Sequence, residues 1–285
     1  MFIVTGATGH LGRLVVEELL ARGVSASDVV AVVRDPQKAA DLRARGVQAR
    51  QADYDRPDTL KAAFAGGGRL LFVSSSEVGR RMPQHGNVVD AAVAAGVDKL
   101  VYTSLLGADS TSVGLAKEHW PTEKLIHKSG LPYTVLRNGW YLENYTEKLA
   151  PALEHGAIVG SAGQGRISAA TRADYAAAAA VVLIGDGHDG ATYELAGDVA
   201  FTMPELAAEV ARHSGKPVVY RDLPEVEYAK ALAAAGLPRP VAEMIADSDV
   251  GVAKGELLNQ STHLRDLIGR PTTPMPEAVA AALRD

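Results

Sequence analysis

Three glycines near the start of the chain have the spacing of a phosphate-binding loop. An apolar run at residues 2–4 predicts a buried strand, and leucines and valines at helical spacing follow the third glycine. In such a turn the first glycine permits the bend, the second leaves room for a pyrophosphate, and the third lets helix and strand pack closely. The alternative is a glycine turn used only for packing. The loop residues expected to contact a dinucleotide are Gly6, Ala7, Thr8, Gly9, His10 and Leu11, with Gly12 as the third glycine.

One arginine stands where a dinucleotide-binding protein reads the ribose. Arg34 directly follows the strand expected at residues 29–33. An acidic side chain at this place would hold the 2′-hydroxyl of NAD, whereas a guanidinium accommodates the 2′-phosphate of NADP. Arg34 therefore favours NADPH, unless it is only a solvated surface arginine. Asp35 leaves a second alternative open, because it either caps the next helix or points at the ribose and favours NAD.

A run of serines ends the fourth expected strand. Ser74, Ser75 and Ser76 follow residues 69–73, and the carboxyl ends of parallel strands are where open α/β sheets bind ligands. We expect these serines at the same edge of the sheet as the glycine loop. Ordinary turn chemistry is the alternative.

The wider sequence alternates apolar strands with helices, which is typical of a parallel sheet covered on both faces. We therefore predict an α/β fold with a Rossmann-type, doubly wound parallel sheet. The expected strands are residues 2–4, 29–33, 47–51, 69–73, 99–103 and 133–136, with helices near 37–45, 57–64, 83–95 and 116–128. Pro121 either starts or kinks the last of these helices.

After Arg137 strands become scarce. An alanine-rich helix at 173–184 is expected to return to the sheet. The other expected elements are helices at 203–213, 226–235 and 241–249 and short strands at 193–195 and 218–220. We predict an NADP-binding domain over 1–137, joined by 171–184, and a smaller, mostly helical substrate or lid domain over 138–285.

The composition excludes several classes of function. The chain of 285 residues has no cysteine, which excludes disulfides, thiolate catalysis and cysteine-ligated metals. Its net charge of -5 and the lack of a long basic block argue against nucleic acid. The longest apolar run, residues 176–184, is too short to span a bilayer. The first expected strand begins at residue 2, so we expect no signal peptide and a cytoplasmic protein.

Several motifs together resemble one family. The segments TGATGHLG, VVRDP, SSSEVG and LPYTVLRNGWYLENY are similar to the NmrA-like atypical short-chain dehydrogenase/reductases. Within that group, RQADYD, YTSLL, ATRADYAAAAA, YELAGD and ADSDVG add a resemblance to the flavin-free bacterial NADPH:quinone oxidoreductases. The resemblance runs from Met1 to about Pro274.

The resemblance implies NADPH as the cofactor, a quinone as the small-molecule substrate, and neither flavin nor metal. It also places the three serines against the cofactor. The segment that it assigns to the nicotinamide side is Asn138, Gly139, Trp140, Tyr141, Leu142 and Glu143. Trp140 and Tyr141 either wall an aromatic substrate or belong to the core.

The usual tyrosine–lysine catalytic pair of this family is missing, because no tyrosine is followed by lysine four residues later. His119 falls where related ether reductases carry a lysine, so it either donates a proton to the substrate or is a surface histidine beside Glu118. The resemblance also leaves open a dinucleotide-sensing regulator without turnover, and a reductase of azo, triphenylmethane or ether compounds. A homodimer is one assembly open to such a chain.

Overall fold

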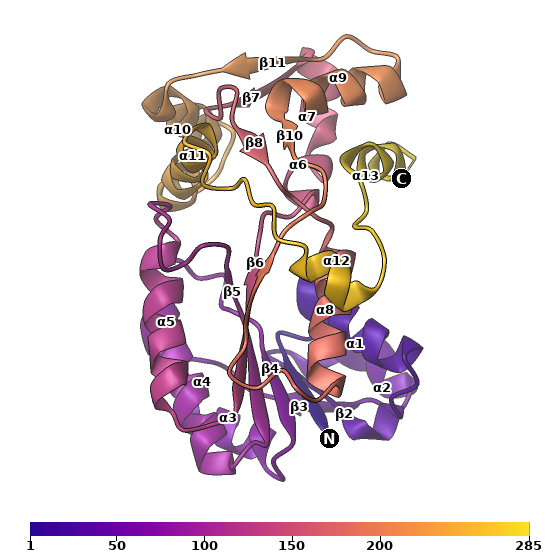
Figure 1. The fold of residues 1–285 in the computed structure, drawn as a ribbon, viewed down its shortest axis with the longest axis vertical. Helices are drawn as coiled ribbons and strands as arrows, with labels where there is room; N and C mark the ends of the chain where they lie inside the picture. Colours follow the sequence, from indigo (N-terminus) through magenta and orange to yellow (C-terminus); the bar gives the residue numbers. More distant parts are fainter. Residues whose placement is uncertain (285) are drawn as a thin grey trace. The chain divides into compact units, whose positions relative to one another are not determined.

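The computed structural model describes residues 1–284, which form two compact units (Figure 1). Unit 1 comprises Met1–Leu105, Glu118–Asn138 and Arg172–Tyr193. Unit 2 comprises Leu106–Lys117, Gly139–Thr171 and, within the described residues, 194–284. The chain therefore enters and leaves each unit more than once.

Unit 1 is built on a seven-stranded sheet in the order β3-β2-β1-β4-β5-β6-β9. The strands from β1 to β6 are parallel, which confirms the predicted doubly wound sheet. Their bounds are Phe2–Thr5 (β1), Val29–Val33 (β2), Gln48–Gln51 (β3), Arg69–Phe72 (β4), Lys99–Leu105 (β5), Tyr133–Asn138 (β6) and Thr192–Leu195 (β9).

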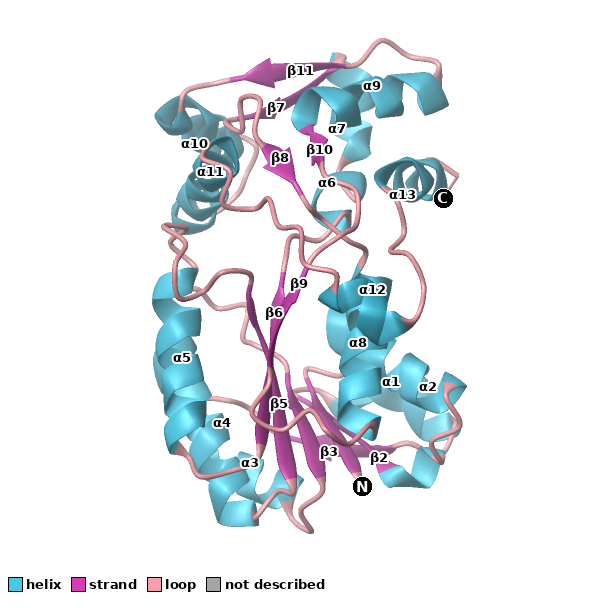
Figure 2. Cartoon of the chain, in the orientation of Figure 1, coloured by secondary structure: helices cyan, strands magenta, loops and turns pink. Residues whose placement is uncertain are grey.

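Helices cover both faces of this sheet, as Figure 2 shows. Helices α3, α4 and α5 lie on one face, and α1, α2 and α8 lie on the other (Figures 1 and 2). Their bounds are His10–Ala21 (α1), Ala40–Ala44 (α2), Pro57–Phe64 (α3), Arg81–Ala95 (α4), Ala116–Lys128 (α5) and Arg172–Ile184 (α8). Short 3-10 turns, Ala26–Asp28 (η1) and Pro36–Ala39 (η2), flank β2.

The core of unit 1 explains why its strands read as continuous apolar runs. All five residues of β2 and all seven of β5 are buried, because a sheet with helices on both faces has no solvent side. The cluster on one face contains Phe64, Phe72 and Tyr102, none of which is exposed to solvent. This packing fixes the carboxyl ends of the strands, where the candidate site lies.

Unit 2 has mostly helices and two small sheets. The sheets pair β10 with β8 and β11 with β7. Its strands are Ala157–Gly160 (β7), Arg166–Ile167 (β8), Phe201–Thr202 (β10) and Val219–Asp222 (β11). Its helices are Glu143–Thr146 (α6), Leu149–His155 (α7), Met203–Ser214 (α9), Glu225–Ala234 (α10), Arg239–Ala253 (α11), His263–Ile268 (α12) and Met275–Ala282 (α13).

The structure differs from the sequence-based expectations in a few elements. The strands β7, β8 and β10 and the helices α6, α7, α12 and α13 were not predicted. Pro121 neither starts nor ends α5 but lies inside it. Proline lacks an N–H, so residue 121 makes no hydrogen bond to the carbonyl four residues earlier, and α5 loses one intrahelical bond there.

Candidate functional site

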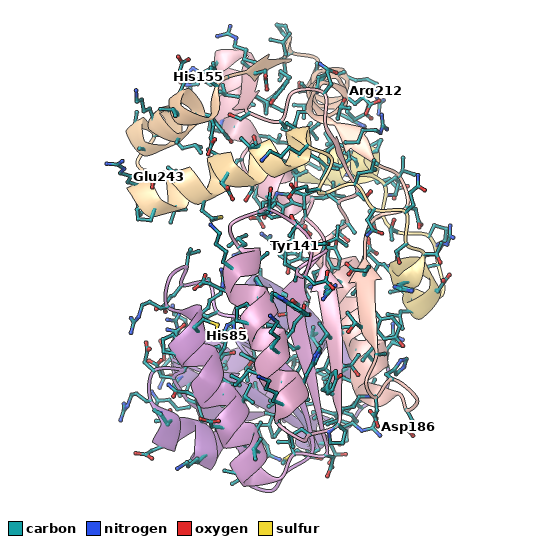
Figure 3. All side chains as sticks on the ribbon, turned by 60° about the vertical axis from the view of Figure 1, so that its left-hand side comes forward. His85, Tyr141, His155, Asp186, Arg212 and Glu243 are labelled. Atoms are coloured by element: carbon teal, nitrogen blue, oxygen red, sulfur yellow. The ribbon has the colours of Figure 1, made fainter. Side chains whose placement is uncertain are left out.

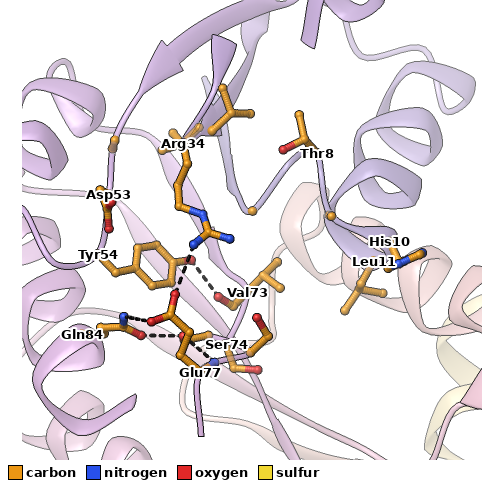
Figure 4. Close-up of a pocket in the computed structure, with 18 residues that line it drawn as sticks. Thr8, His10, Leu11, Arg34, Asp53, Tyr54, Val73, Ser74, Glu77 and Gln84 are labelled. Atoms are coloured by element: carbon orange, nitrogen blue, oxygen red, sulfur yellow. Dashed lines mark hydrogen bonds and ion pairs between the residues drawn. The ribbon is translucent and has the colours of Figure 1, made fainter. Parts of the chain in front are cut away.

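A cavity of about 310 Å³ lies in unit 1, beside the place where the strand order reverses. Strand β1 has β2 on one side and β4 on the other, so the chain winds in opposite directions from it. Open α/β sheets bind ligands at this switch point. The cavity is lined by the glycine loop, the end of β2, residues 52–54 after β3, and residues 73–77 after β4 (Figure 4).

The glycine loop has the geometry that the sequence predicts. Gly6 has a φ of 60°, a left-handed conformation that favours glycine. A Cβ on Gly12 would lie 2.4 Å from the Gly6 carbonyl oxygen, so α1 can approach the turn only with glycine there. Gly9 is the N-cap of α1 and offers no side chain to cap it. The first turn of α1 therefore presents backbone N–H groups without a side-chain cap, which suits a phosphate.

Arg34 lies at the mouth of this cavity, with its side chain 70% exposed. Its Nη1 lies 3.1 Å from Oε1 of Glu77. The neighbouring Asp35 has a different role, because its Oδ1 accepts the N–H of Gln37 at 2.9 Å and caps η2. Of the two alternatives that the sequence left for Asp35, the structure shows the cap.

The serine run forms one wall of the cavity and is held from behind. The N–H of Ser74 donates to Thr103 Oγ1 at 2.9 Å, and the N–H of Ser75 donates to His85 Nε2 at 3.0 Å. The guanidinium of Arg81 donates through Nε to the Ser75 carbonyl at 2.6 Å. These bonds from β5 and α4 fix the backbone of the wall (Figure 3 shows His85 on α4).

The floor of the cavity is closed by a tyrosine. The Tyr54 hydroxyl lies 2.7 Å from the Val73 carbonyl and 2.6 Å from Thr5 Oγ1, which ties together the ends of β1 and β4. Burial raises the pKa of the Tyr54 phenol, so it stays neutral and remains a hydrogen-bond donor.

His119 is not the exposed residue that one alternative describes. It lies on α5 with 5% of its surface exposed, and its Nδ1 is 2.8 Å from the Tyr102 hydroxyl. Burial, and then the positive charge of Arg81, lowers the pKa of the His119 imidazole, while burial raises the pKa of Tyr102. Both side chains are therefore neutral. The bond is satisfied when the phenol donates to Nδ1, which leaves the ring proton on Nε2.

One turn further along α5, the carboxylate of Glu123 forms a buried ion pair with Arg137. Glu123 is fully buried and accepts hydrogen bonds from Arg137 at 2.7 Å and 3.0 Å and from Ser104 at 2.5 Å. This bidentate pair links α5 to β5 and β6. Because both of its oxygens are engaged, the Glu123 carboxylate stabilises the fold around His119.

The sequence-predicted residues do not all meet in one place. Among residues 1–284, those lining the cavity include Gly6, Thr8, Gly9, His10, Leu11, Arg34 and Ser74–Ser76. Ala7 is fully buried beside it, and its N–H donates to the Val32 carbonyl at 3.3 Å.

The segment from Asn138 to Glu143 divides between the units. Asn138 ends β6 in unit 1 and is 4% exposed, whereas residues 139–143 belong to unit 2. There, Leu142 belongs to the hydrophobic core and Trp140 packs against it. Tyr141, labelled in Figure 3, is half-buried and forms an isolated bridge with Ala170. Gly139 donates its N–H to the Leu195 carbonyl at 2.8 Å, and Glu143 begins α6.

Sequence reasoning did not identify several residues of this site, among them Tyr54, Glu77, Gln84 and His85. Tyr54 and Glu77 lie a few residues after expected strands, so their position at the binding edge was a usable signal. Gln84 and His85 lie within α4, and no local pattern distinguishes them from other residues on the buried face of that helix.

The residues present fit a dinucleotide phosphate backbone. Glycine at position 12 lets α1 pack close to the loop, the N-terminus of α1 is positively polarised, and the exposed Arg34 follows β2 at the mouth of the same cavity. Fold and cavity thus define a Rossmann-type dinucleotide-binding protein. A family model described as NAD(P)H-binding matches residues 6–183, and the chain belongs to this family.

Comparison with known proteins confirms the predicted resemblance to bacterial quinone oxidoreductases. The chain is 54% identical over 280 residues to quinone oxidoreductase 2 of Escherichia coli K12, covering 98% of each protein. The crystal structure of an NADPH-dependent quinone oxidoreductase from Escherichia coli in complex with NADPH matches with a TM-score of 0.96 and 53% identity, over 99% of this chain and 100% of that one. A Citrobacter triphenylmethane reductase complexed with NADP(H) matches with a TM-score of 0.95 and 41% identity, over 99% of this chain and 100% of that one.

Neither a membrane-spanning helix nor a metal centre is found in the described part of the chain. No helix within residues 1–284 is long and apolar enough to cross a membrane. The same residues contain no group of three or more histidine, aspartate or glutamate side chains that could hold a metal ion.

Proposed function

We propose that this chain is an NADPH-dependent reductase that transfers hydride to a quinone or a similar aromatic acceptor. The observation that carries the proposal is the pairing of a glycine-rich phosphate cradle with Arg34 at the ribose position of the same cavity. The high identity to a protein named quinone oxidoreductase supports the choice of acceptor. The related triphenylmethane reductase supports aromatic acceptors as a class.

Different residues of the cavity hold different parts of the cofactor. The N–H groups at the start of α1 receive the pyrophosphate, and Arg34 receives the 2′-phosphate through its planar guanidinium. Ser74 to Ser76 form the wall along the cofactor, held in place by Thr103, His85 and Arg81. Bound NADPH supplies the hydride, and the protein supplies position and exclusion of water.

His119 acts as a neutral hydrogen-bond donor toward the acceptor oxygen. In the tautomer in which the Tyr102 phenol donates to Nδ1, the ring proton of His119 lies on Nε2 and can be donated to the acceptor. A quinone accepts hydride readily and its oxygen can take a proton from water, so this donor is helpful and not obligatory. Asn138 and residues 139–143 are assigned to the nicotinamide side, and the region 138–285 is assigned to acceptor binding.

The test is NADPH oxidation at steady state with a simple benzoquinone, for wild type and for His119→Ala. We expect turnover by both proteins, with the variant slowed by about 100-fold or less, the low end of the range for general acid catalysis. His119→Asn, which keeps an N–H donor, is the matched control and should recover part of the rate. Tight NADPH binding without turnover on quinones, azo dyes or triphenylmethane dyes would instead favour a dinucleotide-sensing regulator.

We also propose a cytoplasmic location and a homodimeric assembly. The location rests on the composition discussed above, and the assembly on the family resemblance. Size-exclusion chromatography with light scattering measures the assembly directly, and a mass of one chain of 29.9 kDa would contradict the dimer.

A further inference from the structure

The guanidinium proposed to receive the 2′-phosphate already has an anionic partner. Arg34 Nη1 lies 3.1 Å from Glu77 Oε1, and both side chains line the same cavity (Figure 4). Arg34 comes from the end of β2 and Glu77 from the segment between β4 and α4, so the contact joins two walls of the cavity. A phosphate that binds Arg34 must therefore compete with this carboxylate.

The second oxygen of Glu77 is held by other groups. Its Oε2 accepts a hydrogen bond from Gln84 Nε2 at 3.1 Å and lies 3.5 Å from Arg80 Nη1. Arg80 and Gln84 are in turn bonded to Asp55 at 3.0 Å and 3.1 Å. The backbone N–H of Glu77 donates to Ser75 Oγ at 3.1 Å, which anchors the residue to the serine wall. Glu77 thus stands between two arginines and is bound on both sides.

We propose that Glu77 is a built-in competitor of the 2′-phosphate and sets how tightly, and how selectively, the site binds phosphorylated dinucleotides. This inference rests on the proposed function. When a 2′-phosphate binds, Arg34 exchanges the carboxylate for the phosphate, and Glu77 keeps its bonds to Arg80 and Gln84. A nucleotide that lacks the 2′-phosphate leaves the ion pair between Arg34 and Glu77 intact.

The physical consequence is a reduced affinity for the phosphorylated ligand. The free energy gained by the contact between Arg34 and the phosphate is offset by the lost contact with Glu77 and by repulsion between the two anions. Glu77 therefore weakens binding of the reduced cofactor and favours release of the oxidised one, because both forms carry the same 2′-phosphate. The carboxylate does not affect ligands that make no contact with Arg34.

The test uses nucleotide fragments, so that binding is measured without turnover. The probes are 2′,5′-ADP, which carries the 2′-phosphate, and 5′-AMP, which does not, titrated by calorimetry into the full chain. Glu77→Gln should tighten 2′,5′-ADP roughly threefold to fivefold, the upper part of the range for removing one exposed opposing charge, and leave 5′-AMP unchanged. Glu77→Ala should act in the same direction.

Asp55→Asn is the matched control. It removes one carboxylate from the same network, bonded to Arg80 and Gln84 but not to Arg34. It should leave 2′,5′-ADP affinity within about twofold of wild type, since a charge that Arg34 does not contact is largely screened.

The outcomes separate the inference from the proposed function. Weaker or unchanged binding of 2′,5′-ADP by Glu77→Gln would overturn the inference alone, and weaker binding would assign Glu77 to positioning Arg34. Equal tightening by Asp55→Asn would also overturn it, because the effect would then be one of net charge. If the wild type prefers neither fragment, the assignment of Arg34 to a 2′-phosphate fails, and the inference fails with it.

Discussion

The histidine behind the serine wall should make the protein sensitive to acid. His85 is fully buried, and burial followed by the charge of Arg81 lowers the pKa of its imidazole to about 3 from 6.5. The ring has a fixed arrangement, because Nε2 accepts the N–H of Ser75 and Nδ1 lies 2.9 Å from Thr122 Oγ1. A protonated ring would place an N–H against the Ser75 N–H and break the bond that supports the wall.

The sign and the size of the effect follow from the two pKa values. The folded pKa lies below the unfolded one, so the stabilising contribution is present above about pH 6.5 and is lost as the pH falls toward 3. Between pH 8 and pH 5 the imidazole of the unfolded chain becomes protonated while the native one stays neutral. This difference costs about 2 kcal/mol of unfolding free energy, at about 1.4 kcal/mol for each pKa unit.

The assay is urea unfolding followed by circular dichroism at pH 8 and at pH 5, for wild type and for His85→Gln. The variant cannot titrate, so its loss of unfolding free energy between the two pH values should be about 2 kcal/mol smaller than that of wild type. His155→Gln is the matched control, because His155 is exposed at the end of α7, as labelled in Figure 3. His155→Gln should lose as much unfolding free energy between pH 8 and pH 5 as wild type does.

Each protein is compared with itself at two pH values. A change in packing that lowers the unfolding free energy equally at both values therefore cancels from the difference. His119, whose pKa is also lowered, contributes equally to wild type and variant and cancels. An identical loss in wild type and His85→Gln would refute the reasoning, since the buried ring would then be contributing nothing to acid sensitivity.

Three further results are expected. Arg34→Ala should weaken NADPH by about 10- to 100-fold in a fluorescence titration, because a charge-assisted bond to phosphate is lost, and should change NADH little; equal weakening of both would show another role. Gly9→Val should abolish NADPH binding while circular dichroism stays native, because the side chain fills the place of the pyrophosphate, and retained binding would contradict the cradle. Burial raises the pKa of Asp249 to about 6 from 3.8, so native Asp249 holds its proton longer than the unfolded chain, and stability falls as pH rises from about 4 to 6. Asp249→Asn should therefore raise the unfolding free energy by up to about 3 kcal/mol at pH 8 and by almost nothing at pH 4, and an equal change at both would count against this account.

Much of unit 1 could be predicted because its signals are local. The strand at 29–33 and the helices at 57–64 and 116–128 have the predicted bounds, since a buried strand reads as an apolar run and a helix as a periodic one. The glycine loop was recognisable because each glycine is required for its own steric reason. Gly12 is the clearest case, since a Cβ there would collide with the backbone of Gly6. These requirements involve residues close together in the sequence.

What the sequence did not reveal depends on distant contacts. The partner of Arg34 is Glu77, 43 positions away, and no pattern in the sequence joins them. The two residues of β8 and the two of β10 form strands only because they pair with each other, so neither has a signal of its own. Burial of His119 depends on Tyr102 from another element, and the sequence alone could not choose between a surface and a buried histidine.

The order in which unit 1 is assembled has a consequence for how the protein is made. Helix α8, which packs against α1, and strand β9, at the edge of the sheet, come from residues 172–195, after the chain has passed through the first two segments of unit 2. A ribosome must therefore release well over half of the polypeptide before the first helix acquires its partner. Until then the glycine loop belongs to an incomplete sheet, so we expect nascent chains to bind nucleotide only late in translation. A fragment ending at residue 137 should likewise bind nucleotide more weakly than the full chain.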